Sequence, residues 1–177
     1  MPGEEVIICD EEDQVLPAGQ HGEIWIRGPN TIEGYYKAPE LTQENFSSSG
    51  FWKSGDMGYS DEQGYVYLVD RKQDMIITGG YNVYAVEVEN CLNSHPAIQN
   101  SAVVGVPHDI WGEEVCAMVI LVQGSTASEK ELIDHCKRHL ARYKAPKKIK
   151  ITDQLPLSPA GKVLRREVRR LLQRKSD

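Results

Sequence analysis

The strongest constraint on the fold is a run of consecutive apolar residues in the second half of the chain. Every residue from Val115 to Val122 is apolar. A strand with one face in water alternates apolar and polar side chains, so an unbroken run is typical of a strand covered on both faces. The run from Ser101 to Val106 predicts a second strand. We therefore expect the strand at 115–122 to be central in its sheet, with helices flanking the sheet.

Helical signals lie on both sides of these strands. Residues 85–92 predict a helix that ends near Ser94, His95 and Pro96. Ser128 followed by Glu131 is a capping box, and the apolar residues behind it recur at helical spacing. A last helix is expected from about Val163, with Leu164, Val168, Leu171 and Leu172 on one side. Residues 147–151 predict an edge strand rich in lysine. The second part of the chain is thus predicted to be an α+β unit, a three-stranded sheet with flanking helices.

The first part of the chain has a different pattern. Short β-rich segments occur at residues 6–9, 23–26 and 64–69, and the last of these follows a turn at 60–63. They predict a small antiparallel sheet or barrel. The pattern changes after Asp70, where a short apolar strand at 75–77 is broken by Gly79 and Gly80. The overall expectation is an α+β protein in two structural pieces.

Composition excludes several classes of function. The chain has 177 residues, of which 40% are hydrophobic, and a net charge of −6. An acidic balance argues against general nucleic-acid binding. No apolar run is long enough for a transmembrane segment, no signal-peptide pattern precedes the first strand, and the last residues are not a peroxisomal signal. We expect a cytoplasmic protein.

The cysteines and histidines do not predict a metal site. The four cysteines are dispersed, with neither the spacing of a zinc site nor that of a disulfide framework: Cys9, Cys91, Cys116 and Cys136. His135 and His139 are four residues apart on a predicted helix, which is the spacing of a metal pair. The sequence shows no third ligand near them, so the expectation is that no metal is bound.

The segment from Leu155 to Lys162 is the first candidate site. Prolines and a glycine bend it, and it ends in Lys162 directly before a basic helix. A lysine on a loop can carry its ammonium into an anion-binding pocket, whereas a lysine on a packed helix is held in place. The alternative is a solvated lysine at a helix start.

Three further positions carry candidate chemistry. Asp56 follows a glycine in a predicted turn, where its carboxylate could accept hydrogen bonds from the hydroxyls of a ribose or could only cap the turn. Arg71 offers a forked cation for ribose or phosphate oxygens, or an ion pair with Asp70 or Asp74. Gly79 and Gly80 let the backbone approach a ligand, or form a hairpin turn.

In order along the chain, these motifs resemble the adenylate-forming superfamily, which contains acyl-CoA synthetases, adenylation domains of nonribosomal peptide synthetases and beetle luciferases. The resemblance runs from about Gly22 to Arg166. It rests on these segments: Gly22–Gly28, Glu33–Tyr36 with Leu41 and Thr42, Phe51–Asp56, Val69–Val83, Val106–Asp109 with Gly112 and Glu113, Leu140–Pro146, and Leu155–Arg165.

The resemblance implies a role for each candidate residue. Lys162 would be the catalytic lysine of adenylate formation, and Asp56 and Arg71 would bind the ribose of ATP or AMP. Gln73 falls at the hinge between the large and small domains, where the family usually has Asp or Lys. The loop of Gly79, Gly80 and Tyr81 would contact CoA and line the tunnel for its pantetheine arm.

The resemblance also implies a domain plan. Residues 1–70 would be the end of the large AMP-binding domain, 71–74 the hinge, and 75–177 a small mobile lid. The family's phosphate-gripping loop, acyl pocket and magnesium-binding glutamate precede the position where this chain begins. We therefore expect a C-terminal portion of a longer enzyme, inactive by itself, with the N-terminal domain of the same protein as its partner.

The implied activity is that of an AMP-forming acyl-CoA synthetase for fatty or related carboxylic acids. Its small-molecule substrates would be the acid, ATP and CoA, with Mg²⁺ held outside this chain. Two alternatives remain: a standalone adenylation domain that loads a carrier protein, and a non-catalytic lid or binding module.

Overall fold

The computed structural model describes residues 3–173, which form two compact units that divide between Gln73 and Asp74. This division falls within the segment 71–74 for which a hinge was expected. Whether the segment moves as a hinge stays a prediction.

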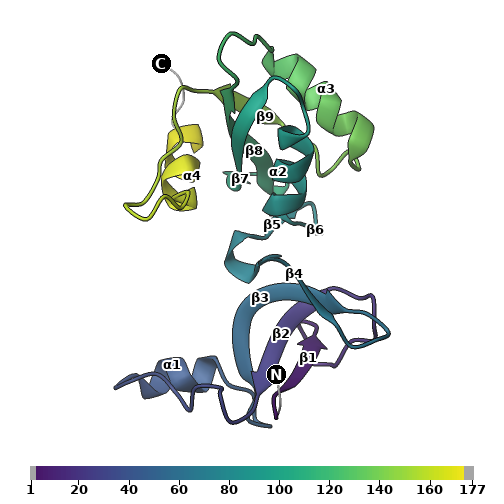
Figure 1. Ribbon diagram of the computed structural model, residues 1–177, viewed down its shortest axis with the longest axis vertical. Helices are drawn as coiled ribbons and strands as arrows, with labels where there is room; N and C mark the ends of the chain where they lie inside the picture. Colours follow the sequence, from purple (N-terminus) through teal and green to yellow (C-terminus); the bar gives the residue numbers. More distant parts are fainter. Residues whose placement is uncertain (1–2, 174–177) are drawn as a thin grey trace. The chain divides into compact units, whose positions relative to one another are not determined.

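The first unit is an antiparallel sheet in the order β1-β2-β3-β4, with a short helix beside it (Figure 1). Its buried centre consists of Cys9, Trp25 and Phe51. The expected small antiparallel sheet is therefore present. Its elements are β1 (Glu5–Cys9), β2 (Gly22–Arg27), α1 (Pro39–Glu44), β3 (Trp52–Ser60) and β4 (Val66–Arg71), followed by a 3₁₀ turn at Lys72–Asp74.

Strand β3 contains a segment that the sequence led us to expect as a turn. The register of β2 against β3 shifts between Glu23 and Trp25, so that Ser54, Gly55 and Asp56 form a bulge. Gly55 has a φ of +74°, which a residue with a Cβ rarely adopts. Asp56 thus lies at a bulge within a strand. The turn expectation was wrong because glycine and polar residues also mark bulges.

The second unit is built on a five-stranded sheet, larger than the three strands expected. A hairpin of two short strands adds to it through β5, which pairs with β8 at Thr78 and Gly112. Its elements are β5 (Ile76–Thr78), β6 (Tyr81–Val83), α2 (Ala85–Asn93), β7 (Ile98–His108), β8 (Gly112–Leu121), α3 (Glu129–His139), β9 (Lys148–Ile151) and α4 (Arg165–Gln173).

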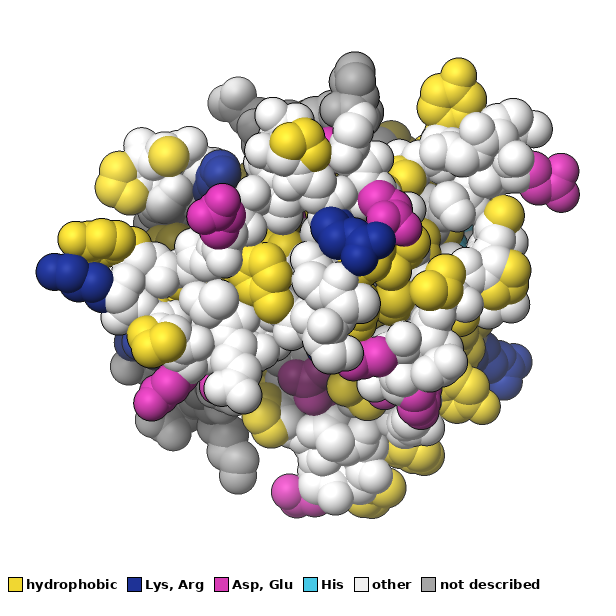
Figure 2. Space-filling view, turned by 90° about the horizontal axis from the view of Figure 1, so that it is seen from below, with side chains coloured by type: hydrophobic (Ala, Val, Ile, Leu, Met, Phe, Trp, Pro, Cys, Tyr) yellow, Lys and Arg dark blue, Asp and Glu magenta, His cyan; other side chains and the backbone are white. Residues whose placement is uncertain are grey.

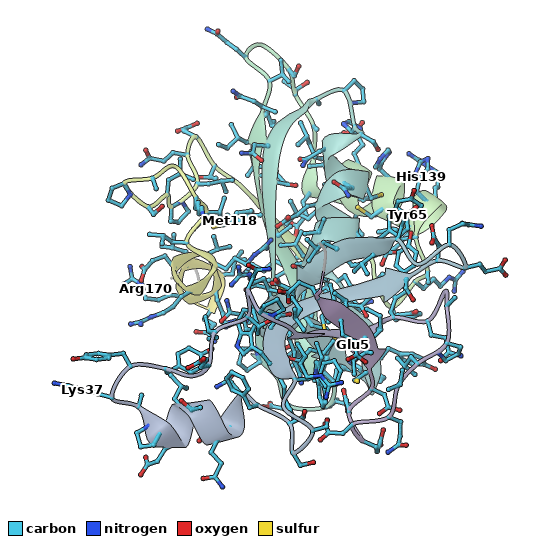
Figure 3. The ribbon with its side chains drawn as sticks, turned by 60° about the horizontal axis from the view of Figure 1, so that its bottom comes forward. Glu5, Lys37, Tyr65, Met118, His139 and Arg170 are labelled. Atoms are coloured by element: carbon cyan, nitrogen blue, oxygen red, sulfur yellow. The ribbon has the colours of Figure 1, made fainter. Side chains whose placement is uncertain are left out.

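Both faces of the central strands are covered, as the apolar run predicts. Helices α2 and α3 lie on one face of the sheet and α4 lies on the other (Figure 1). Side chains of β8 alternate between the two cores: Val115, Ala117 and Val119 face α2 and α3, whereas Cys116 and Met118 face α4. Figure 3 shows Met118 on the side of the sheet where α4 lies.

The starting points of α3 and α4 can be compared with those expected from the sequence. The Ser128 side chain accepts from the Glu131 backbone N–H and the Glu131 carboxylate accepts from the Ser128 N–H, which confirms the capping box at the start of α3. The last helix begins at Arg165, two residues later than expected. Leu164 therefore precedes the helix and is 41% exposed, while Val168 and Leu172 are buried.

Candidate functional site

Asp56 and Arg71 face each other across two strands. They are register partners on β3 and β4, and Arg71 Nε lies 3.1 Å from Asp56 Oδ1. Sequence reasoning offered Asp70 or Asp74 as the ion-pair partner of Arg71, and the fold supplies Asp56 instead. About two thirds of the arginine side chain is exposed. The pair therefore presents carboxylate oxygens and guanidinium donors together on the surface of the first unit.

Beside this pair, a buried glutamate organises the bulge. Glu23 is 7% exposed; it accepts from the Gly55 N–H at 3.1 Å and from Lys72 Nζ at 2.9 Å. A buried carboxylate needs such partners, so Glu23 holds the bulge and the residue after Arg71 in place. Sequence reasoning missed this role. The signal was a charged residue inside the apolar strand β2.

A polar cavity of about 530 Å³ opens in this region of the first unit. Gln73 lines it together with Arg71, Lys72, Lys53 and Glu23. Glu44 and Asn45 also line the cavity, so its walls carry both charged and neutral polar side chains. Cationic and polar side chains around a concave surface suit an anionic or hydroxyl-rich ligand. The predicted residues Arg71 and Gln73 therefore line one cavity, and Asp56 adjoins it as the ion-pair partner of Arg71.

The Lys162 loop is held by a tight turn. Ser158 N–H donates to the Lys162 carbonyl at 2.8 Å, and Gly161 N–H donates to the Ser158 carbonyl at 2.9 Å. Lys162 N–H in turn donates to Ser158 Oγ at 3.1 Å. The Lys162 side chain is exposed and makes no ion pair with any of residues 3–173. An ordered backbone with an unpaired ammonium is suited to meet an external anion.

Arg165 anchors this loop to the rest of the second unit. Its guanidinium contacts Glu89 at 2.6 Å, the Val103 carbonyl at 2.6 Å and Asp74 at 3.4 Å. These partners lie on α2, on β7 and at the start of the unit. The start of α4, three residues after Lys162, is therefore fixed at several points, a function that sequence reasoning did not assign to Arg165.

Gly79 and Gly80 form the turn of the β5–β6 hairpin. Both have positive φ, +58° and +81°, as a type I′ turn requires. Gly79 N–H donates to the Trp111 carbonyl at 2.9 Å, and a Cβ on Gly79 would lie 3.1 Å from the Trp111 ring. A Cβ on Gly80 would meet nothing within 4 Å. The backbone conformation, rather than crowding, is therefore what selects glycine at position 80.

An aromatic cavity of about 220 Å³ lies next to this turn, in the second unit. Tyr81 and Tyr143 stack with ring centroids 4.6 Å apart, and Trp111 forms another wall. Glu114 and Lys147 bring charges to its lining. Trp111 was outside the predicted site. Its side chain is 54% exposed, and an exposed tryptophan is typical of a binding surface.

A cluster of histidine and cysteine side chains lies where α2 packs against α3. One ligand atom from each of Cys91, His135 and His139 lies within 4.8 Å of the other two. Burial lowers the pKa of His135, and the nearby histidines lower it further, so the ring is neutral at pH 7. Burial raises the pKa of the neighbouring Cys136 thiol to about 12. The sequence could not show that Cys91 meets the two histidines.

The surface shows no concentration of one charge on the face drawn in Figure 2. Acidic and basic side chains alternate there with hydrophobic ones in several separate places.

Among residues 3–173, none of the helices has the length and hydrophobicity to cross a bilayer.

Comparison with known proteins gives consistent matches. Residues 87–162 match the family model described as "AMP-binding enzyme C-terminal domain". The chain is 44% identical over 158 residues to 2-succinylbenzoate–CoA ligase of Geobacillus kaustophilus, covering 88% of this chain and 32% of that protein. It is 40% identical over 169 residues to long-chain-fatty-acid–CoA ligase of Yersinia pestis, covering 96% and 30%. The chain thus spans about a third of the length of these relatives.

A solved structure matches over nearly the whole chain. The crystal structure of ATP-bound MatB from Rhodopseudomonas palustris superposes with a TM-score of 0.92 at 38% identity. The match covers 98% of this chain and 35% of that one. At this level of identity the likeness extends beyond the fold to the amino-acid sequence.

Proposed function

Since residues 87–162 of this chain belong to the family of AMP-binding enzyme C-terminal domains, we propose that the chain is the C-terminal part of an AMP-forming carboxylate–CoA ligase. A carboxylate attacks the α-phosphorus of ATP and releases pyrophosphate to give acyl-AMP. The thiol of CoA then attacks the acyl carbon and releases AMP to give the thioester. The acid class proposed is fatty or related carboxylic acids, the range spanned by the two relatives.

The observation that carries this proposal is the exposed, unpaired Lys162 on its ordered loop. In the first half-reaction, negative charge grows on the oxygens of the transferring phosphoryl group. A preorganised ammonium that is not paired with any carboxylate of residues 3–173 stabilises that charge without first breaking an ion pair there. Gly161, with a φ of +76°, and the Ser158 bonds shape the loop that presents it.

Asp56 and Arg71 are proposed to bind the ribose of the nucleotide. A carboxylate accepts from two vicinal hydroxyls, and its ion pair with Arg71 holds it in one orientation. Gln73 is the proposed hinge, at the division between the two units. An amide there can form hydrogen bonds in two domain orientations, without the charge that the family's usual Asp or Lys would bring.

The aromatic cavity beside Gly79 is the proposed contact for the pantetheine arm of CoA. This arm is a thin, mostly neutral chain, and the cavity walls are aromatic rings. Tyr81 follows directly on the glycines and lines the same cavity, so we assign it to the same proposed contact with CoA. Lys147, an exposed cation in the lining, would favour the negatively charged end of CoA.

The remaining parts of the enzyme are proposed to lie outside this chain, on an N-terminal domain of the same protein. That domain would hold the acyl pocket and the Mg²⁺ that accompanies ATP. Glu23, the buried carboxylate of the polar cavity, is already taken up by Lys72 and the Gly55 N–H, so we assign no magnesium ligand to it. The proposed location is the cytoplasm.

The test compares the two half-reactions in the full-length enzyme. Lys162→Ala should lower acid-dependent pyrophosphate release by roughly 10²–10³-fold, while thioester formation from supplied acyl-AMP changes little. Lys150→Ala, an exposed lysine of β9, is the matched control and should leave both rates unchanged. Equal losses in both half-reactions for Lys162→Ala would contradict the assignment.

A separate experiment tests whether CoA is the acceptor of the acyl group. Tyr81→Ala and Trp111→Ala remove walls of the aromatic cavity and should raise the KM for CoA without slowing adenylate formation. Tyr65→Ala, an exposed tyrosine of the first unit, is the control. An enzyme that releases pyrophosphate but makes no thioester with CoA would instead point to a carrier protein as acceptor.

A further inference from the structure

We propose that Cys91, His135 and His139 form a binding site for Zn²⁺ that joins α2 to α3. The three candidate ligand atoms lie within 4.8 Å of one another. This site is separate from the nucleotide and CoA residues described above, and it does not depend on the proposed function.

Helix packing brings the three residues together. His135 and His139 are one helical turn apart on α3, so their rings lie on the same face. Cys91 is in the last turn of α2, the helix that packs against α3 in the same core. The sequence separation of 44 residues between Cys91 and His135 explains why the spacing of residues alone did not reveal a third ligand.

Backbone carbonyls set the protonation of both rings. His135 Nε2 lies 3.0 Å from the Cys91 carbonyl oxygen, and His139 Nδ1 lies 2.9 Å from the His135 carbonyl oxygen. A carbonyl only accepts, so each of these nitrogens carries the hydrogen and donates it. The opposite nitrogen of each ring then keeps its lone pair for a ligand. Histidines that bind metals are typically oriented by such a second hydrogen bond.

The donor set selects the metal. Two imidazole nitrogens and one thiolate sulfur suit Zn²⁺, whereas Mg²⁺ and Ca²⁺ prefer oxygen ligands. Zinc bonds of about 2.1 Å to nitrogen and 2.3 Å to sulfur put tetrahedral ligands about 3.4–3.6 Å apart. Closing from 4.8 Å therefore requires a movement of about 1 Å, within the reach of side-chain rotation.

The site is both sheltered and accessible. Cys91 and His135 are each 9% exposed, whereas His139, labelled in Figure 3, is exposed and its ring centroid lies 4.5 Å from that of His135. The metal would enter on the His139 side, and the thiol would lose its proton on binding. Water would complete the coordination there. His95, whose ring centroid lies 5.0 Å from that of His135, is the neighbouring side chain that could replace the water.

The experiment measures Zn²⁺ binding by the 177-residue chain, reduced and freed of metal. We expect one Zn²⁺ per chain, and a rise in melting temperature of a few degrees at saturating metal. Co²⁺ in place of Zn²⁺ should show the intense d–d bands of a four-coordinate site together with a thiolate-to-metal charge-transfer band.

Variants assign the ligands. His139→Ala changes an exposed side chain, so the chain should stay folded. Zn²⁺ should bind at least about 10–100-fold more weakly, since the loss of even an outer-shell partner of a metal ligand costs about that much. Cys91→Ser should abolish the charge-transfer band. His21→Ala, in the first unit, is the control and should bind as the parent does. The proposal is overturned if the parent binds no Zn²⁺, if His139→Ala binds equally well, or if the Co²⁺ form shows no thiolate band.

Discussion

Arg165 Nη1 donates to Glu89 Oε1 at 2.6 Å, which joins the start of α4 to α2 only three residues after Lys162. The arginine also contacts Asp74, the first residue of the second unit. Both Glu89 and Arg165 are largely buried, with 15% and 21% of their side chains exposed. The position of the Lys162 loop therefore depends on a polar network inside the unit.

Arg165→Ala should lower the free energy of unfolding of the chain by about 2–3 kcal/mol, because it removes the cation that pairs with the largely buried Glu89 carboxylate and donates to the Val103 carbonyl. The Val103 N–H still donates to Glu89 Oε1 but brings no charge to balance it. Urea unfolding measures this. Arg170→Ala is the matched control on the same helix. Its partner Glu167 forms a more exposed pair, so the loss should stay below about 1 kcal/mol. Similar losses for both arginines would show that the network adds no stability beyond a surface pair.

Substitutions of Gly80 should act through backbone strain. Because its φ is +81° and no atom would crowd a Cβ, Gly80→Ala and Gly80→Leu should each destabilise the chain by about 1 kcal/mol. Gly80→Asn should cost clearly less, since asparagine tolerates positive φ. Thermal unfolding of the three variants tests this. A cost for leucine several-fold above that for alanine would reveal a steric contact.

This conformation changes how access of CoA can be examined. Enlarging Gly80 would selectively block the proposed CoA tunnel only if the glycine were not at positive φ, and that condition is not met. Gly80→Leu therefore mixes strain with any steric block. The aromatic residues Tyr81 and Trp111 are cleaner targets, because neither has a positive φ.

Alkaline pH should weaken the second unit through Cys116. Burial in the core raises the pKa of this thiol to about 12, and the Glu114 carboxylate adds to the rise. Above pH 9 the thiol ionises in the unfolded chain while it stays protonated in the folded one. Stability is thus lost as pH rises from about 9 toward 12, with a slope of at most about 1.4 kcal/mol per pH unit from this group.

Cys116→Ala should flatten that decline between pH 8.5 and 10.5, measured as the urea midpoint at each pH. The substitution also lowers stability at every pH, so the slope is the quantity to compare. Parallel curves for the two proteins would mean that Cys116 ionises equally in both states.

The chain by itself should neither release pyrophosphate from ATP nor form acyl-CoA. The relatives it matches are about three times as long, and the proposed phosphate loop and acyl pocket lie outside it. Acid-dependent pyrophosphate release by the purified chain, measured with a coupled assay, would contradict this. Release restored by adding the N-terminal domain in trans would support it.

What the sequence by itself determined was local in origin. The apolar run from Val115 to Val122 determined a strand covered on both faces, and Ser128 with Glu131 determined where α3 begins. The ordered motifs around Lys162 indicated the family. These signals depend on periodicity, capping and turn chemistry within a few residues, so they can be recognised without knowing what lies across the fold.

Only the tertiary structure decided which distant side chains meet. The bulge at Gly55 puts Asp56 opposite Arg71, and the packing of α2 on α3 brings Cys91 to the two histidines. It also made Arg165 an anchor and set both hairpin glycines at positive φ. Such contacts depend on register and packing between segments far apart in the chain, so they cannot be predicted from a residue's neighbours in sequence.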